Sequence, residues 1–190
     1  MEKRIKEIRL AEMRAIDNEE KMIVEGYAAT FDSVTDLGWT KEVIDRRAFD
    51  ECDMTDVCMK YNHSDELLIM ARTRNGSLQL EVDDIGLKIR AELIDTTQNK
   101  DLYKMIQARL LTKMSFAFVV EEEQVDYEND LRRITKISKL FDVSVVDVPA
   151  YESTEIYARS KEQYEKEKTE YEERKKLELA KAKAIALLSL

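Results

Sequence analysis

The sequence contains few residues that interrupt regular structure, with one proline and four glycines among 190 residues. Stretches rich in glycine and proline mark turns, loops and flexible connections between domains. Their scarcity, together with a length typical of one domain, predicts a single compact domain with few long linkers and at most a short appendage.

Residues that bind metals or form disulfides are also scarce. The chain has one histidine, His63, and two cysteines, Cys52 and Cys58, with five residues between them. A structural zinc site needs four ligands, and these three residues do not supply a set of the usual spacing. We therefore expect no metal and no cofactor, and we interpret the cysteines as reduced thiols of a cytosolic protein.

Long apolar runs and an excess of basic charge are missing as well. No apolar run approaches the ~18 residues of a membrane-spanning helix, and residues 1–9 carry charges throughout, without the apolar core of a signal peptide. The net charge of −9 argues against nucleic acid or an anionic membrane as the main partner, because both select for basic surfaces. Hydrophobic residues make up 44% of the chain, which is enough for a substantial core.

Alternating apolar and polar residues predict a chain rich in strands. The alternation places strands at residues 22–31, 57–61, 78–82, 87–93, 114–120, 131–137 and 140–149. The pair at 78–93 is the clearest hairpin. Residues 3–16 fit a helix or a strand, and we favour a strand. A helix is expected from Thr96 or Thr97 to about Leu111, a turn or short helix at 43–49, and an acidic loop at 121–130.

The composition changes sharply after Arg159. Residues 161–183 are almost entirely Glu, Lys, Gln, Tyr, Leu and Ala, which favours a charged helix. We therefore divide the chain into a domain at 1–158 and a helical tail at 159–190. Two interpretations of the tail stay open: a solvated or partly disordered helix, and a helix that forms a coiled coil or docks onto a partner.

The stretch around Ser115 places one small hydroxyl among apolar residues. Met114, Phe116 and Phe118 alternate with Ser115 and Ala117, so the three large side chains are expected to face the core and Ser115 the opposite side. Such a serine is either a small filler or a nucleophile. A nucleophile needs a base, and the base needs an orienting group, so the interpretation depends on partners.

His63 and Asp142 are the candidates for those two roles. His63 follows the predicted 57–61 strand and has polar neighbours, which favours a position in a cleft. Asp142 lies in an apolar run, where a carboxylate is costly to bury unless it is hydrogen-bonded or paired. Alternation groups Asp142 with Ser144, opposite Phe141. A surface or structural histidine and a solvent-facing carboxylate on an edge strand remain the alternatives.

Six segments follow one another in the order of a known protease family. They are Gly26–Phe31, Val43–Phe49, Asn62–Asp65, Gly86–Leu87, Met114–Phe118 and Asp142–Ala150. In this series the chain resembles the prohead (capsid maturation) proteases of HK97-type tailed bacteriophages, over about residues 1–158. That family is similar in fold to the herpesvirus assemblins. The resemblance therefore implies an α+β fold with a β-barrel core flanked by helices, to which the composition adds a C-terminal charged helix.

The resemblance also implies roles for three residues. Ser115 corresponds to the nucleophile, His63 to the general base and Asp142 to the acid that orients the histidine. The sequence departs from the family pattern at Ala117, where the family usually has glycine, and at Asp142, where it often has glutamate. Ser64 stands where an aspartate usually follows the histidine.

Two features of the site stay open at this level. Asp65 and Asp147 remain alternatives for the third role. The oxyanion donors are unassigned, because the Arg132–Arg133 pair is suggested by analogy with the assemblins, whereas a charged pair in a strand is more often solvated surface.

The function implied by the resemblance is that of a serine endopeptidase in capsid maturation. It would cleave the scaffolding segment of the phage major capsid protein, and also itself, inside the assembling prohead in the host cytoplasm. The expected partners are the capsid protein and that segment, with self-association left open and neither nucleic acid nor membrane involved. The alternatives are a non-catalytic capsid-assembly or scaffolding module on the same fold, with Ser115 a filler, and an unrelated β-barrel binding module.

Overall fold

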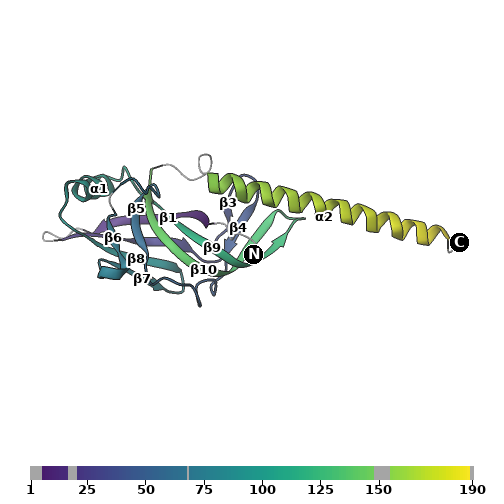
Figure 1. The fold of residues 1–190 in the computed structure, drawn as a ribbon, viewed down its shortest axis with the longest axis horizontal. Helices are drawn as coiled ribbons and strands as arrows, with labels where there is room; N and C mark the ends of the chain where they lie inside the picture. The colour runs from purple at the N-terminus through teal and green to yellow at the C-terminus, as the bar shows by residue number, and fades with distance from the viewer. Residues whose placement is uncertain (1–5, 17–20, 68, 148–154, 189–190) are drawn as a thin grey trace.

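The computed structural model describes residues 6–16, 21–67, 69–147 and 155–188, and Figure 1 shows their arrangement. The elements follow in the order β1 (Lys6–Ile16), β2 (Met22–Thr30), β3 (Thr35–Asp36), β4 (Lys41–Ile44), β5 (Cys58–Tyr61), β6 (Ala71–Arg72), the 3-10 helix η1 (Thr73–Asn75), β7 (Leu78–Val82), β8 (Gly86–Leu93), α1 (Thr97–Gln107), β9 (Lys113–Asp126), β10 (Leu131–Val146) and α2 (Glu155–Leu188).

One mixed sheet contains all of these strands. Its order is β3-β4-β10-β9-β1-β2-β8-β7, with β5 paired to β10 and β6 paired to β5. Both β4 and β5 run parallel to β10, but β4 pairs with residues 131–134 and β5 with residues 142–145. The long strand β10 therefore pairs with β4 near its beginning and with β5 near its end.

The expected β-barrel is not closed. β3 and β7 are the two ends of the strand order, and within the described residues no pairing joins them. β3 has only two residues, too few to form the ladder that would complete a barrel. The α+β class is confirmed, with α1 and the C-terminal α2 as its helices. The sheet is open, and the likeness to the assemblin fold stays a prediction.

The large apolar residues of β9 face the core, as their alternation predicts. Met114, Phe116 and Phe118 are at most 1% exposed. The rings of Phe116 and Phe118 stack with their centroids 4.6 Å apart, and Phe49 packs 6.2 Å from Phe116. This packing leaves Ser115 on the opposite face of the strand.

The hairpin of β7 and β8 also forms where the sequence predicts it. Oδ1 of Asp83 accepts hydrogen bonds from the backbone N–H groups of Ile85 at 2.8 Å and Gly86 at 3.0 Å, which closes the turn. A Cβ on Gly86 would lie 2.0 Å from the carbonyl oxygen of Ala29 in the neighbouring strand β2. Glycine is therefore required there for the close approach of the two backbones.

α1 begins as expected but ends earlier. The side chain of Thr96 accepts a hydrogen bond from the backbone N–H of Asn99, which caps the first turn. The helix stops at Gln107 because the chain turns at Arg109, whose φ is +58°. Leu110, beyond the end of the helix, is 73% exposed.

α2 contacts the domain along its first half and then extends away from it (Figure 1). Tyr164 is 5% exposed, and its ring lies 5.0 Å from that of Trp39 and 5.5 Å from that of Tyr127. Lys168 and Lys175 form ion pairs with acidic residues of the turn between β9 and β10. The helix is therefore held by an aromatic contact and a row of charges.

Beyond Lys175, α2 exposes large apolar side chains to solvent. Leu177, Leu179 and Ile185 are all more than half exposed. In the part of the chain that the structure describes, no helix is long and apolar enough to cross a membrane.

Candidate active site

Ser115 lies in the middle of the sheet, on the face of β9 that does not meet the core. It is paired with Leu10 of β1 on one side and with Ser144 of β10 on the other. Its side chain is nevertheless fully buried. Because β9 has a paired strand on both sides here, the backbone N–H of Ser115 lies within the ladder. It is therefore not available to bind an oxyanion.

Asp142 reaches the same face through an irregularity in β10. The pairing register with β9 shifts between Leu140 and Asp142, so Phe141 is an extra residue in the strand. Leu140 is 1% exposed in the core, Phe141 is 36% exposed and Asp142 is 0% exposed. A bulge of this kind re-aims the following side chain. The bulge places Asp142 on the same face as Ser115, and its burial rules out the alternative of a solvent-facing carboxylate.

His63 enters from the loop after β5. β5 is parallel to β10, and the backbone N–H of Asn62 donates to the carbonyl of Val145 at 2.8 Å. The side-chain oxygen of Asn62 accepts from the backbone N–H of Asp147 at 3.2 Å. Asn62 and His63 both have positive φ, +50° and +54°. This tight left-handed turn directs the imidazole back over the sheet.

The three side chains meet in one continuous series of contacts. Nδ1 of His63 lies 2.5 Å from Oδ1 of Asp142, and Nε2 lies 2.8 Å from Oγ of Ser115. The His63 side chain is 11% exposed and that of Asp142 1%. An acid, an imidazole and a hydroxyl in this order have the arrangement that activates a serine nucleophile.

The two other acids that the sequence left open have different partners. Asp65 lies 2.5 Å from Nζ of Lys60, and Oδ2 of Asp147 accepts a hydrogen bond from the hydroxyl of Tyr61 at 3.0 Å. The imidazole contact belongs to Asp142. The geometry therefore favours Asp142 for the third role.

Ser144 is a part of the site that the sequence analysis missed. Its hydroxyl donates to Oδ1 of Asp142 at 2.9 Å, and Ser144 is fully buried. The signal was present in the sequence, because residues two apart in a strand share a face. Ser144 was grouped with Asp142 on that basis but was given no role.

The Arg132–Arg133 pair lies far from these residues. Arg132 forms ion pairs with Glu42 and Glu123, and Arg133 with acidic residues of the loops near β2 and β4. Arg132 and Ser144 are twelve positions apart on β10, which spans up to roughly 40 Å at about 3.3 Å per residue. The two arginines therefore stabilise the far end of the sheet and do not reach Ser115.

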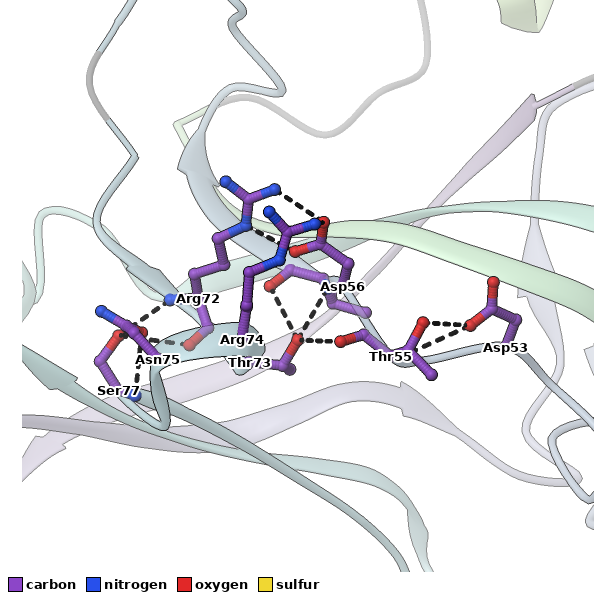
Figure 2. Close-up of polar contacts among 9 residues, drawn as sticks. Asp53, Thr55, Asp56, Arg72, Thr73, Arg74, Asn75 and Ser77 are labelled. Carbon is purple, nitrogen blue, oxygen red and sulfur yellow. Dashed lines mark hydrogen bonds and ion pairs between the residues drawn. The ribbon is translucent and has the colours of Figure 1, made fainter.

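A polar cluster anchors the outer side of β5, the strand that precedes His63. Figure 2 shows Asp56 accepting hydrogen bonds from Arg72 and Arg74, with Nε of Arg72 at 2.5 Å. The hydrogen bond from Arg72 lowers the pKa of Asp56 and so keeps it ionised. Oγ1 of Thr73 accepts from the backbone N–H of Val57 at 2.9 Å. β5 is thus fixed between β10 and this cluster.

Cys52 offers no competing nucleophile of low pKa. Both cysteines are free. Burial, with the nearby charge of Asp53, raises the pKa of Cys52 to about 12, so its thiol stays protonated. Cys58 lies opposite Asp142 in the β5–β10 pairing. Among the described residues, no group of three or more His, Cys, Asp and Glu side chains is placed to hold a metal ion.

A protein-family model and a solved structure are similar to this chain. Residues 9–169 match the family model of the caudovirus prohead serine protease. Among solved structures, the chain is similar to the bacteriophage T4 capsid assembly protease, gp21, with a TM-score of 0.56 and 13% identity over 76% of this chain and 99% of that chain. At that identity the likeness concerns the fold alone. No curated protein sequence matches the chain. Because the family model spans most of its length, the chain belongs to the caudovirus prohead serine protease family.

Proposed function

We propose that this chain is a serine endopeptidase with Ser115 as nucleophile, His63 as general base and Asp142 as orienting acid. The observation that carries the proposal is the unbroken series of contacts from Asp142 through His63 to Ser115, at 2.5 and 2.8 Å. Membership of a serine protease family supports the same chemistry.

Each of the three residues has a distinct task. Nδ1–H of His63 donates to Asp142, which leaves Nε2 free to accept the proton of Ser115 as Oγ attacks the scissile carbonyl. The charge of Asp142 stabilises the imidazolium, which then protonates the leaving amine. A water molecule deprotonated by the same Nε2 releases the acyl group and restores the serine. All of these steps use side chains of the chain itself.

We further propose that the substrate is the scaffolding segment of the phage major capsid protein, with the protease as a second substrate. The family is described as acting in the prohead, and the T4 protein is described as a capsid assembly protease. The enzyme would act inside the assembling prohead in the host cytoplasm. The end of α2 beyond Lys175, which extends away from the domain, would dock the enzyme into the shell (Figure 1).

A serine-reactive fluorophosphonate and a co-expression assay test these proposals together. Wild-type protein should label on Ser115 and should cleave the capsid protein of its own phage, with the new termini read by mass spectrometry. Ser115→Ala should abolish labelling and cleavage while the protein stays folded. Ser138→Ala is the matched control, because Ser138 lies on β10 with its hydroxyl 3.4 Å from the carbonyl of Val119, away from His63.

The alternative, a non-catalytic assembly module, predicts a different result in the same experiment. Wild-type protein would then fail to label at Ser115 and would leave the capsid protein intact. Cleavage that persists in Ser115→Ala would remove Ser115 from the nucleophile role.

A further inference from the structure

We propose that Lys60 is a positioning residue for the catalytic site: it fastens the loop that carries His63 through Asp65, and its charge lies beside Asp142. The inference rests on the proposed function, since it assigns Lys60 a task in holding the base and the acid of that mechanism.

Lys60 lies on the same face of the sheet as the site. It is paired with Ser144 in the β5–β10 ladder, two pairs along from Cys58 and Asp142. Residues of a strand alternate in direction, so Lys60 shares the face of Ser144 and Asp142, whereas Met59 points into the core. The Lys60 side chain is only 15% exposed, which is unusual for a lysine.

The ammonium group of Lys60 closes the loop around His63. Its Nζ lies 2.5 Å from Oδ1 of Asp65, two residues after His63. On the other side of the histidine, Asn62 is bound to β10 through its backbone and its side chain. The two consecutive positive φ angles at Asn62 and His63 persist only when surrounding contacts hold them. The Lys60–Asp65 pair supplies that restraint on the far side of the turn.

The charges near Lys60 support a second effect. Burial opposes the ammonium charge, but the hydrogen bond that Lys60 donates to Asp65 and the negative charges of Asp142 and Asp65 outweigh it and raise the pKa of Lys60. Lys60 is therefore charged at neutral pH. Because the attraction is mutual, the same charge favours the ionised carboxylate of Asp142 that orients the imidazole.

Three variants separate these two effects. Lys60→Met removes the charge and the ion pair but keeps an unbranched apolar stem. Asp65→Asn removes the ion pair and leaves the lysine beside Asp142, and the Asp65 side chain is 88% exposed, so this variant is expected to fold. Lys60→Arg keeps the charge and a donor. Lys136→Met is the matched control, because Lys136 forms a similar pair with Glu51 at 2.7 Å on a remote part of β10.

Steady-state kinetics on a peptide substrate should show an effect on turnover rather than on binding. Lys60→Met should lower kcat about tenfold or more with KM within about twofold, Lys60→Arg should recover most of the loss, and Asp65→Asn should lie between them. Lys136→Met should behave as wild type.

The pH profile gives a readout that a merely structural lysine would not move. The charged groups around the imidazole are Asp142 from β10, Lys60 from β5 and Asp65 from the loop, with Asp147 bound by Tyr61 at the end of β10. Removing the positive charge of Lys60 makes it easier for His63 to take up a proton. The acid limb of the kcat profile should therefore move to higher pH in Lys60→Met, whereas in Asp65→Asn, which removes a negative charge, it should not move to higher pH.

Hydrogen exchange of the amides at residues 62–66 tests the restraint without reference to activity. Exchange should be faster in Lys60→Met and Asp65→Asn than in wild type and Lys136→Met. An active wild type with unchanged kcat, pH profile and exchange in Lys60→Met overturns this inference alone. A wild type that neither labels nor cleaves overturns the proposed function, and the exchange rates then still decide whether Lys60 holds the loop.

Discussion

Ser144 and His63 share one oxygen atom of Asp142. The hydroxyl of Ser144 donates to Oδ1 at 2.9 Å, and Nδ1 of His63 lies 2.5 Å from the same atom. Two donors that converge on one oxygen fix the rotation of the carboxylate. Because Asp142 and Ser144 are both fully buried, water does not replace this restraint. Orientation of the base therefore depends on a second hydroxyl directly opposite Ser115 in the ladder.

Ser144→Ala should slow turnover without abolishing it. Loss of one hydrogen bond to a charged group corresponds to about 1.5–3 kcal/mol, and part of that loss should appear in the transition state, which gives a fall in kcat of about tenfold. KM should change little, because Ser144 is fully buried and so does not contact substrate. Single-turnover cleavage of a peptide measures the effect, with Ser138→Ala as the control. A kcat equal to that of wild type would show that Asp142 is oriented by other contacts.

Asp142→Asn should be far more damaging. An amide can present its NH₂ group to the imidazole and favour the wrong tautomer, and it removes the charge that stabilises the imidazolium. The equivalent Asp→Asn change in a well-studied serine protease costs about 10⁴ in kcat, and the direct 2.5 Å contact here predicts a loss of similar size. Asp147→Asn is the control, because that acid is bound to Tyr61. A rate for Asp142→Asn within about threefold of wild type would remove Asp142 from the site.

Asp142→Glu should also lose activity, although the related family often carries glutamate at this position. The side chain is 1% exposed and already in contact with His63, so one more methylene overpacks a closed site. We expect a loss of about 10–100-fold in kcat and a fall in unfolding free energy of about 1–3 kcal/mol. Thermal unfolding and peptide cleavage measure the two effects. Full activity of this variant would mean that the strand shifts to accept the longer acid.

The local pattern of the sequence predicted the placement of Ser115 but not that of its partners. Alternation around Ser115 is a short-range signal, and it correctly placed Met114 and Phe116 in the core. The contact between His63 and Asp142 spans 79 residues and depends on the parallel pairing of β5 with β10. The local pattern of neither strand predicts that pairing. The histidine could be proposed mainly because the chain has no other.

The errors have identifiable physical causes. Residues 121–130 were expected to form an acidic loop, but β9 continues to Asp126 because its acids pair across the ladder, as Glu123 does with Arg132. A solvent-facing Asp142 was left open because simple alternation does not anticipate the bulge at Phe141. In both cases the pairing with a neighbouring strand decided the outcome, and the local pattern does not show that pairing.

Acid should loosen the attachment of α2. The hydrogen bond from Lys168 lowers the pKa of Asp130 in the folded protein. A carboxylate with a lowered folded pKa stabilises the fold above its unfolded pKa of about 3.9, and the contribution disappears as the pH falls through the lower folded value. Both groups are partly exposed, so the effect is small and weakens with salt.

The fluorescence of Trp39 can measure this effect, because the sequence has one tryptophan and its ring lies 5.0 Å from Tyr164 of α2. The emission should shift to the red on acidification below about pH 4. Asp130→Asn should show part of that shift already at neutral pH, whereas Asp95→Asn, in a surface pair with Lys100, should not. An acid response in Asp130→Asn as large as in wild type would assign the effect to other groups.

Two truncations of α2 should have opposite consequences, because its two halves have different surroundings. Removing residues 176–190 keeps the contacts of Tyr164, Lys168 and Lys175 with the domain. Peptide cleavage should then stay within about twofold of wild type and Trp39 emission should not change. Incorporation into proheads should fall, measured as protease per shell after co-expression with the capsid protein.

Removing residues 161–190 instead uncovers Trp39 and Tyr127, and it should lower the unfolding temperature and shift the emission to the red. Normal incorporation of the shorter truncation would refute the docking role of the helix end. Loss of peptide cleavage in that truncation would mean that residues 176–190 complete the protease fold.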